Sequence, residues 1–293
     1  MRVGTRASAL ALWQASWVVG ELRDRGIASE LVEITTTGDR GEGIGDKGRW
    51  TSAIESALLD GRVDVAVHSA KDVPGEIALG TVLAAIPRRE DSGDVICGAG
   101  SLEELKPGAR LGTSSVRRAA QIRAIRDDLE IVELRGNVDT RLRKLAEGQA
   151  DAIVLALAGV RRLGREGEVG GVLEGLVPAP GQGALLLQTR AEDATTIAAV
   201  QPLSDTVARA CVFCERAFAS TLNASCNTPL GANAVPAGEH TRLRAWIGLP
   251  DGSHWITDEL TGAADEVGAA LAMRMISVGA RELLDAAEVM AAA

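Results

Sequence analysis

A lysine and an aspartate stand side by side where an apolar segment ends. Apolar and polar residues alternate from Val63 to Val67, and the run His68-Ser-Ala-Lys-Asp-Val-Pro74 follows. Alternation of this kind is typical of a β-strand, which a proline does not continue. Open α/β sheets bind ligands at the carboxyl ends of their strands, so we expect Lys71 and Asp72 to project into a crevice there, each shifting the other's ionisation. The alternative for this dipeptide is a surface ion pair at a turn.

Arginines follow the ends of three other predicted strands. Each strand leads into a turn rich in hydroxyls or glycine and then into a helix that carries arginine in its first turns. The three junctions are Arg2-Val-Gly-Thr-Arg-Ala-Ser8, Leu111-Gly-Thr-Ser-Ser-Val-Arg-Arg118 and Arg135-Gly-Asn-Val-Asp-Thr-Arg141. Helix N-termini attract anions, and guanidinium groups bind carboxylates with two parallel hydrogen bonds. The repeated pattern predicts a polyanion site; the alternative is that each arginine pairs with a local acid or solvates a helix.

The first of these helices has a recognisable start. Ser8 is the expected N-cap of a helix that continues to about Asp24. The spacing of Leu10, Trp13 and Trp17 predicts its buried face.

Length and composition describe a globular protein of several domains. The chain has 293 residues, 46% of them hydrophobic, and its formal net charge is −9. No apolar run approaches the length of a membrane span, and no secretory signal is recognisable at Met1, so we expect a cytoplasmic protein without membrane contact. The absence of a lysine-rich arm or basic domain argues against nucleic acid as a partner.

The four cysteines do not predict a disulfide framework in so long a chain. Cys211 and Cys214 lie one turn apart in a predicted helix, which favours two buried thiols over a metal site. Cys226 differs because it stands in a short polar loop before Pro229, where a thiol is accessible to modification. A zinc or redox protein that uses these three cysteines is a further alternative, although no histidine is spaced to complete such a site. We therefore predict no metal.

Strand and helix patterns alternate in two stretches, which predicts two similar α/β lobes followed by a small α+β domain. We assign residues 1–87 with 184–202 to the first lobe, 88–183 to the second and 203–293 to the C-terminal domain. The apolar strand 184–187 is expected to return to the first lobe's sheet, and one helix from about Ala264 to Ala287 is expected to close the chain. Gly43-Ile-Gly-Asp-Lys-Gly48 lies too far past its strand to bind a dinucleotide, so we interpret it as a flap that presents Lys47.

Several of these motifs, in this order and at this spacing, resemble the hydroxymethylbilane synthase (porphobilinogen deaminase) family. The resemblance runs from Thr5 to about Gly252. It rests on five segments: His68-Ser-Ala-Lys-Asp-Val-Pro74, Gly112-Thr-Ser-Ser-Val-Arg-Arg118, Leu134-Arg-Gly-Asn-Val-Asp-Thr-Arg141, Ala158-Gly-Val-Arg-Arg-Leu-Gly164 and Pro180-Gly-Gln-Gly-Ala184.

The resemblance implies a monomeric transferase of tetrapyrrole and heme biosynthesis with two lobes like those of periplasmic binding proteins. Such enzymes join four porphobilinogen units head to tail into hydroxymethylbilane and release ammonia at each step. A dipyrromethane cofactor, bound through a thioether to the position of Cys226, primes the chain. The acetate and propionate groups of the pyrroles would form the polyanion that the three arginine junctions bind.

The resemblance also implies roles for individual residues. Asp72 matches the catalytic aspartate that stabilises the cationic azafulvene, with Lys71 and Arg6 beside it. Positions that match cofactor-binding residues are Cys226, Lys47, Ser115, Arg117, Arg118 and Asp72. Positions that match substrate-binding residues are Arg6, Ser8, Arg135, Arg141, Arg162 and Gln182.

One departure bears on the cofactor. The family places two glycines before the primer cysteine, whereas Ala224 and Ser225 stand here. If those glycines serve backbone angles closed to other residues, attachment of the primer is impaired. A two-lobed paralogue that binds pyrroles or other anions without condensing them is therefore the alternative function.

Overall fold

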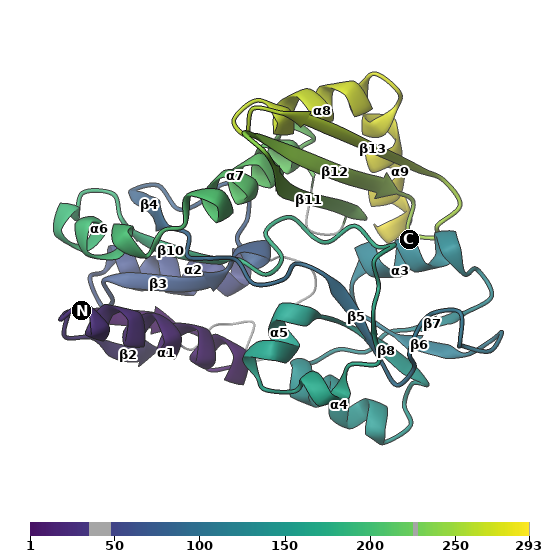
Figure 1. Ribbon diagram of the computed structural model, residues 1–293, viewed down its shortest axis with the longest axis horizontal. Helices are drawn as coiled ribbons and strands as arrows, with labels where there is room; N and C mark the ends of the chain where they lie inside the picture. Colours follow the sequence, from purple (N-terminus) through teal and green to yellow (C-terminus); the bar gives the residue numbers. More distant parts are fainter. Residues whose placement is uncertain (35–47, 225–227, 293) are drawn as a thin grey trace. The chain divides into compact units, whose positions relative to one another are not determined.

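The computed structural model describes residues 1–34, 48–224 and 228–292 and forms two compact units (Figure 1). The first unit comprises Met1–Glu90 and Gly183–Val212, and the second comprises Asp91–Gln182 and Phe213–Ala293. Among the described residues, no helix combines the length and apolar character needed to cross a bilayer.

A five-stranded sheet in the order β2-β1-β3-β10-β4 forms the centre of the first unit. Its strands are β1 (Arg2–Thr5), β2 (Glu30–Glu33), β3 (Val65–Ser69), β4 (Thr81–Ala85) and β10 (Leu185–Arg190). The first three run parallel, and β10 runs antiparallel to its neighbours β3 and β4. The expected return of the strand after residue 184 to this sheet is therefore confirmed.

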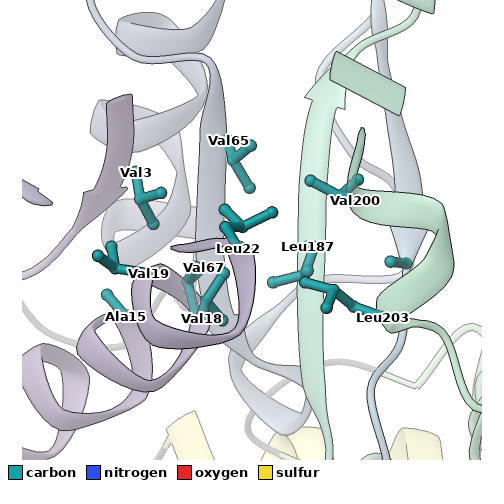
Figure 2. Close-up of a cluster of buried hydrophobic side chains, with 11 residues drawn as sticks. Val3, Ala15, Val18, Val19, Leu22, Val65, Val67, Leu187, Val200 and Leu203 are labelled. Atoms are coloured by element: carbon teal, nitrogen blue, oxygen red, sulfur yellow. The ribbon is translucent and has the colours of Figure 1, made fainter. Parts of the chain in front are cut away.

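Helices cover both faces of this sheet, because successive side chains of a strand point to opposite sides. α1 (Ala9–Asp24) packs Val18 and Leu22 against Val3 and Val65, a cluster that also includes side chains near α6 (Ala194–Val200) (Figure 2). α2 (Gly48–Leu59) packs Ile54 and Leu58 on the other face, around Ala66 of β3. Two short 3₁₀ turns, η2 (Ala70–Asp72) and η4 (Gln201–Leu203), also belong to this unit.

Ser8 caps α1 as expected, since its side chain accepts a hydrogen bond from the Ala11 amide at 3.3 Å. The prediction of the buried face is wrong for Trp13, which is 40% exposed, whereas Trp17 is partly buried and packs against the core cluster. The buried positions are Gln14, Ala15, Val18, Val19 and Leu22. The stripe of small and branched side chains fits closely against the valines of β1 and β3, which leaves the indole of Trp13 on the outer side of the helix.

The second unit repeats the same sheet pattern. Its strand order is β7-β6-β8-β5-β9; β7, β6 and β8 run parallel, and β5 runs antiparallel to both of its neighbours, β8 and β9. The strands are β5 (Asp94–Cys97), β6 (Arg110–Gly112), β7 (Glu130–Val132), β8 (Ala152–Ala156) and β9 (Gly171–Val172). The connecting helices are α3 (Val116–Ile125), α4 (Val138–Ala146) and α5 (Leu157–Arg162), and the turn η3 (Glu166–Glu168) follows them.

A three-stranded antiparallel sheet completes the second unit. It contains β11 (Leu230–Ala237), β12 (His240–Gly248) and β13 (Trp255–Gly262), and it follows α7 (Thr206–Thr221) in the chain. The single closing helix predicted from Ala264 to Ala287 is wrong, because the chain forms α8 (Val267–Ile276) and α9 (Ala280–Ala292). Gly279, at φ 98°, adopts a left-handed angle that interrupts one continuous helix.

The predicted fold class, two α/β lobes and a small α+β domain, is confirmed by the two repeated sheets and the third antiparallel one. The predicted domain boundaries stay a prediction.

Candidate active site

The carboxyl edge of the first sheet holds the first group of candidate residues. β1 and β3 are parallel neighbours, with Val3 opposite Val65, so the segments that follow them leave from one edge. Arg6 directly follows β1, and Lys71 and Asp72 lie in the 3₁₀ turn that follows β3. All three side chains are partly exposed. Lys71 and Asp72 thus lie at the carboxyl edge of the sheet, as the sequence predicts. Open sheets bind their ligands at this edge.

The turn that carries Asp72 is anchored to neighbouring elements. The Ala70 amide donates to the Ala184 carbonyl at 2.9 Å, and the Gln14 side-chain amide donates to the Ser69 hydroxyl at 2.9 Å. One bond joins the turn to the residue before β10 and the other joins it to α1. These two bonds restrict the conformation of the turn before any ligand binds.

The carboxyl edge of the second sheet holds a buried cluster of two arginines and one aspartate. Arg117 donates from Nη1 to Asp94 Oδ2 at 2.7 Å, and Arg118 donates from Nη2 to Asp94 Oδ1 at 2.8 Å. Asp94 is fully buried, and the two arginines are 5% and 4% exposed. Both side chains therefore pair with an acid, but this acid lies 23 and 24 residues away in another strand and is not the local acid of the alternative.

The cluster nevertheless retains an excess of positive charge. Burial opposes ionisation of Asp94, but the two guanidinium groups outweigh it and hold the pKa of that carboxyl well below its usual range. Two cations thus face one anion. The Nε of Arg117 has no hydrogen-bond partner among the described residues, so one donor of this buried fork is left over.

Gln182 belongs to the same cluster. It is 1% exposed, and its side-chain amide donates to Asp94 Oδ1 at 2.8 Å and to the Ser92 carbonyl at 2.7 Å. Ser115, the N-cap of α3, accepts a hydrogen bond from the Arg118 amide at 3.4 Å. These bonds fix the start of α3, so the guanidinium groups of its first turn are held in place.

The second and third arginine junctions meet in the structure. Arg141 in α4 donates from Nη2 to the Ser114 hydroxyl at 2.9 Å, which joins the turns after β7 and β6. Arg135 is exposed and donates to Glu133 at 2.6 Å. Arg162 is partly buried at the end of α5, which follows β8. The three segments that follow the parallel strands β6, β7 and β8 start from the same carboxyl edge.

Two of the predicted site residues, Cys226 and Lys47, lie outside the described residues. The other three cysteines are buried, and burial raises the pKa of the Cys97 thiol to about 11. Within the described part of the chain, no group of three or more histidine, cysteine, aspartate or glutamate side chains is placed to hold a metal ion.

Sequence reasoning missed Asp94, which organises the second edge. A signal was present: an acidic residue opens the otherwise apolar strand Val95-Ile96-Cys97, a position where a buried carboxyl requires a partner. It noted His68 only as part of a motif, although this side chain is 6% exposed and lies 3.0 Å from the side-chain oxygen of Gln188.

Two repeated α/β sheets, each with charged side chains at the carboxyl edge of its parallel strands, define a protein of the α/β class. Comparison with known proteins narrows this class. Residues 1–198 match the family model "Porphobilinogen deaminase, dipyromethane cofactor binding domain", and residues 209–277 match "Porphobilinogen deaminase, C-terminal domain".

Curated relatives agree over almost the whole chain. A porphobilinogen deaminase of Roseiflexus sp. (strain RS-1) is 45% identical over 295 residues, which is 96% of this chain and 97% of the relative. A porphobilinogen deaminase of Deinococcus radiodurans is 42% identical, with 97% of each chain covered. The chain belongs to the porphobilinogen deaminase family. The predicted family, transferase class and dipyrromethane cofactor are thereby confirmed.

Solved structures of substrate-binding proteins also align with the chain. The methionine-binding protein MetQ is 17% identical with a TM-score of 0.45, covering 69% of this chain and 89% of that one. A periplasmic substrate-binding protein of Coxiella burnetii is 15% identical with a TM-score of 0.44, covering 71% of this chain and 93% of that one.

Proposed function

We propose that this chain condenses four porphobilinogen molecules head to tail into hydroxymethylbilane and releases one ammonia at each step. The observation that carries the proposal is the position of Asp72. Its carboxyl follows β3 at the carboxyl edge of the first sheet, in an anchored turn, in a chain that belongs to the porphobilinogen deaminase family.

Asp72 acts electrostatically in this proposal. Loss of ammonia from porphobilinogen leaves a cation, and a carboxylate held beside that cation lowers the barrier to its formation. Lys71 and Arg6 stand at the same edge of the sheet and bind the carboxylates of the substrate, which keeps the reacting carbon close to Asp72. The anchored turn matters because a carboxylate already in place needs no reorganisation during the reaction.

The residues present fit a cofactor that carries carboxylates. The two buried guanidinium groups of Arg117 and Arg118 exceed the charge of Asp94, and the leftover Nε donor of Arg117 suits a further acceptor. We propose that Arg117, Arg118, Ser115 and Lys47 bind the dipyrromethane, which is attached through a thioether to Cys226. When bound, this group supplies the primer to which pyrrole units are added.

The remaining predicted residues bind the growing chain in this proposal. The exposed and partly exposed side chains suited to its carboxylates are Arg6, Ser8, Arg135, Arg141 and Arg162. Gln182 contributes indirectly, because its amide is already bonded to Asp94. We also propose that the protein works as a monomer in the cytoplasm, without a nucleic-acid or membrane partner.

Intact-mass measurement tests the cofactor. Purified protein should carry the added mass of a dipyrrole, and Cys226→Ser should remove it. A bare polypeptide, even after incubation with porphobilinogen, contradicts the proposal and favours the non-catalytic paralogue, for which Ala224 and Ser225 before the cysteine give a reason.

Ammonia release tests the role of Asp72. Asp72→Asn should keep the fold and lower the rate by about 10²–10³ or more. Glu76→Gln is the matched control, because this exposed carboxyl stands four residues further along the chain. Turnover of Asp72→Asn within about threefold of the parent would remove Asp72 from this role.

A further inference from the structure

A buried chain of three polar side chains crosses the α2 face of the first sheet. His68 Nε2 lies 3.0 Å from Gln188 Oε1, and Gln188 Nε2 donates to Glu55 Oε1 at 2.8 Å. The three residues are 6%, 0% and 8% exposed, respectively. Buried polar groups are costly unless they are bonded, so a chain of this kind requires each member to satisfy the next.

The fold brings the three residues together from distant parts of the sequence. β3 and β10 pair antiparallel with Ala66 opposite Gln188 and Leu186 opposite His68, so His68 and Gln188 are diagonal neighbours on one face. α2 covers that face and contributes Glu55. The sequence by itself does not indicate this contact, because it depends on the return of β10.

The three polar side chains are hydrogen-bonded to the segments on both sides of the turn that carries Asp72. His68 precedes Asp72 by four residues, near the end of β3. On the far side of the turn, the Ala78 amide donates to Glu55 Oε1 at 3.0 Å, and Thr81 accepts a hydrogen bond from Gln188 Nε2 at 2.7 Å. The segment between His68 and Ala78 is therefore held at each end by the same three side chains.

The hydrogen bonds define the protonation of His68. Because the amide nitrogen of Gln188 donates to both Glu55 and Thr81, its oxygen faces His68 and can only accept. Nε2 of His68 therefore carries the proton, and Nδ1 is unprotonated in the neutral ring.

Burial favours this neutral ring. It lowers the pKa of His68 to about 4, although Glu55, the bond to Gln188 and Asp72 each act in the opposite direction. The charged groups that act on the imidazole are Glu55 from α2 and Asp72 from η2, while Gln188 of β10 and Thr81 of β4 are uncharged. The amide of Gln188 separates the imidazole from the carboxylate of Glu55, and within residues 1–34, 48–224 and 228–292 no carboxylate is bonded directly to His68.

We propose that His68 is a positioning residue for Asp72, and that Gln188 keeps it neutral by standing between it and Glu55. This inference rests on the proposed function of Asp72. A cationic imidazole would place a permanent positive charge near that carboxylate and would compete with the substrate-derived cation for it. A neutral imidazole holds the end of β3 in place without this competition.

Gln188→Glu tests the proposal, because it replaces the neutral spacer with a second carboxylate of the same size. A carboxylate that bonds directly to Nε2 stabilises the imidazolium, so the pKa of His68 should rise toward or above 6. Below that pKa, kcat for ammonia release should fall on the order of tenfold relative to the parent, and it should recover as the pH rises, with KM for porphobilinogen little changed. The midpoint of the kcat change should match the midpoint of the His68 titration measured by NMR.

Gln188→Met is the matched control. It removes the same hydrogen bonds without adding charge, so any loss of kcat should be independent of pH. A merely structural role for this chain predicts that the two variants share one pH profile, and that result would overturn the proposal.

Titration of the histidines of the untagged parent enzyme by NMR tests the proposal without any substitution. The protein has three histidines, and His240 and His254 are exposed. The His68 signal should keep the neutral form protonated at Nε2 down to about pH 5, well below the ordinary histidine pKa of about 6.5. Titration of His68 near pH 6.5 refutes the inference even if the enzyme is active. Absence of ammonia release from the parent refutes the proposed function and leaves the NMR result intact.

Discussion

Replacement of Asp94 by asparagine should destabilise the second unit strongly. Asparagine has the same shape but no charge, so the guanidinium groups of Arg117 and Arg118, both more than nine-tenths buried, lose their only acidic partner among the described contacts. The side-chain nitrogen of the asparagine is also a hydrogen-bond donor, and it would face the donor groups of an arginine. Loss of one member of a buried ion pair costs about 3–5 kcal/mol.

The size of this effect can be checked by thermal unfolding. An unfolding entropy of about 2.1 cal/mol/K per residue converts the loss into a fall in Tm of about 5–8 °C for a chain of 293 residues. Glu133→Gln is the matched control, since Glu133 and Arg135 form a pair at 2.6 Å with side chains 59% and 68% exposed. An exposed pair contributes about 0–1 kcal/mol, so its loss should move Tm by less than about 2 °C.

The pH dependence gives a second check on Asp94. Because the folded protein holds the pKa of this carboxyl below its usual value, the stabilisation is present above the unfolded pKa and is lost as the pH falls below it. The difference between parent and Asp94→Asn should therefore narrow below about pH 4. Equal stability of Asp94→Asn and Glu133→Gln at neutral pH would refute the reasoning that a buried cluster holds these arginines.

Three further effects on stability are expected. Gly252→Ala should cost at least about 2 kcal/mol, because φ is +77° and a Cβ there would lie 2.6 Å from the Ala124 amide nitrogen; Gly238→Ala, at φ +65° with open space around it, should cost about 1 kcal/mol, and urea unfolding of both variants checks the difference. Acidification should destabilise the parent more than His68→Gln, because the unfolded histidine takes up a proton near pH 6.5 while the folded one resists protonation down to about pH 4. Between neutral pH and pH 5, the parent should lose about 2 kcal/mol more unfolding free energy than the variant. Identical pH profiles of the two proteins would contradict this expectation. Ser115→Ala should lower stability by about 1 kcal/mol through loss of the α3 cap, as measured by the same unfolding assay, and an unchanged midpoint would show that the cap contributes nothing.

Local chemistry made several structural elements predictable. Ser8 is a good N-cap, and it caps α1; Pro74 cannot continue a strand, and β3 ends before it. The turn with Lys71 and Asp72 follows that strand because alternation and a breaker are properties of neighbouring residues. The same is true of the arginine turns after the parallel strands, whose spacing also carried the resemblance to the family.

Other features depended on residues far apart in the chain. The outer position of Trp13 was decided by which stripe of α1 fits the valines of the sheet. The partners of Arg117 and Arg118 could not be inferred from their own segment, because Asp94 stands 23 and 24 residues away in another strand.

The sequence by itself determined the kinds of groups present and the strand ends at which they stand, because these follow from local periodicity, caps and breakers. Only the tertiary structure decided which charges are paired and which protons are held. Asp94 meets two arginines and His68 meets Gln188 because the sheets bring in antiparallel strands from distant segments, and Gln188 in turn bonds to Glu55 of α2. Burial then makes each of these hydrogen bonds obligatory.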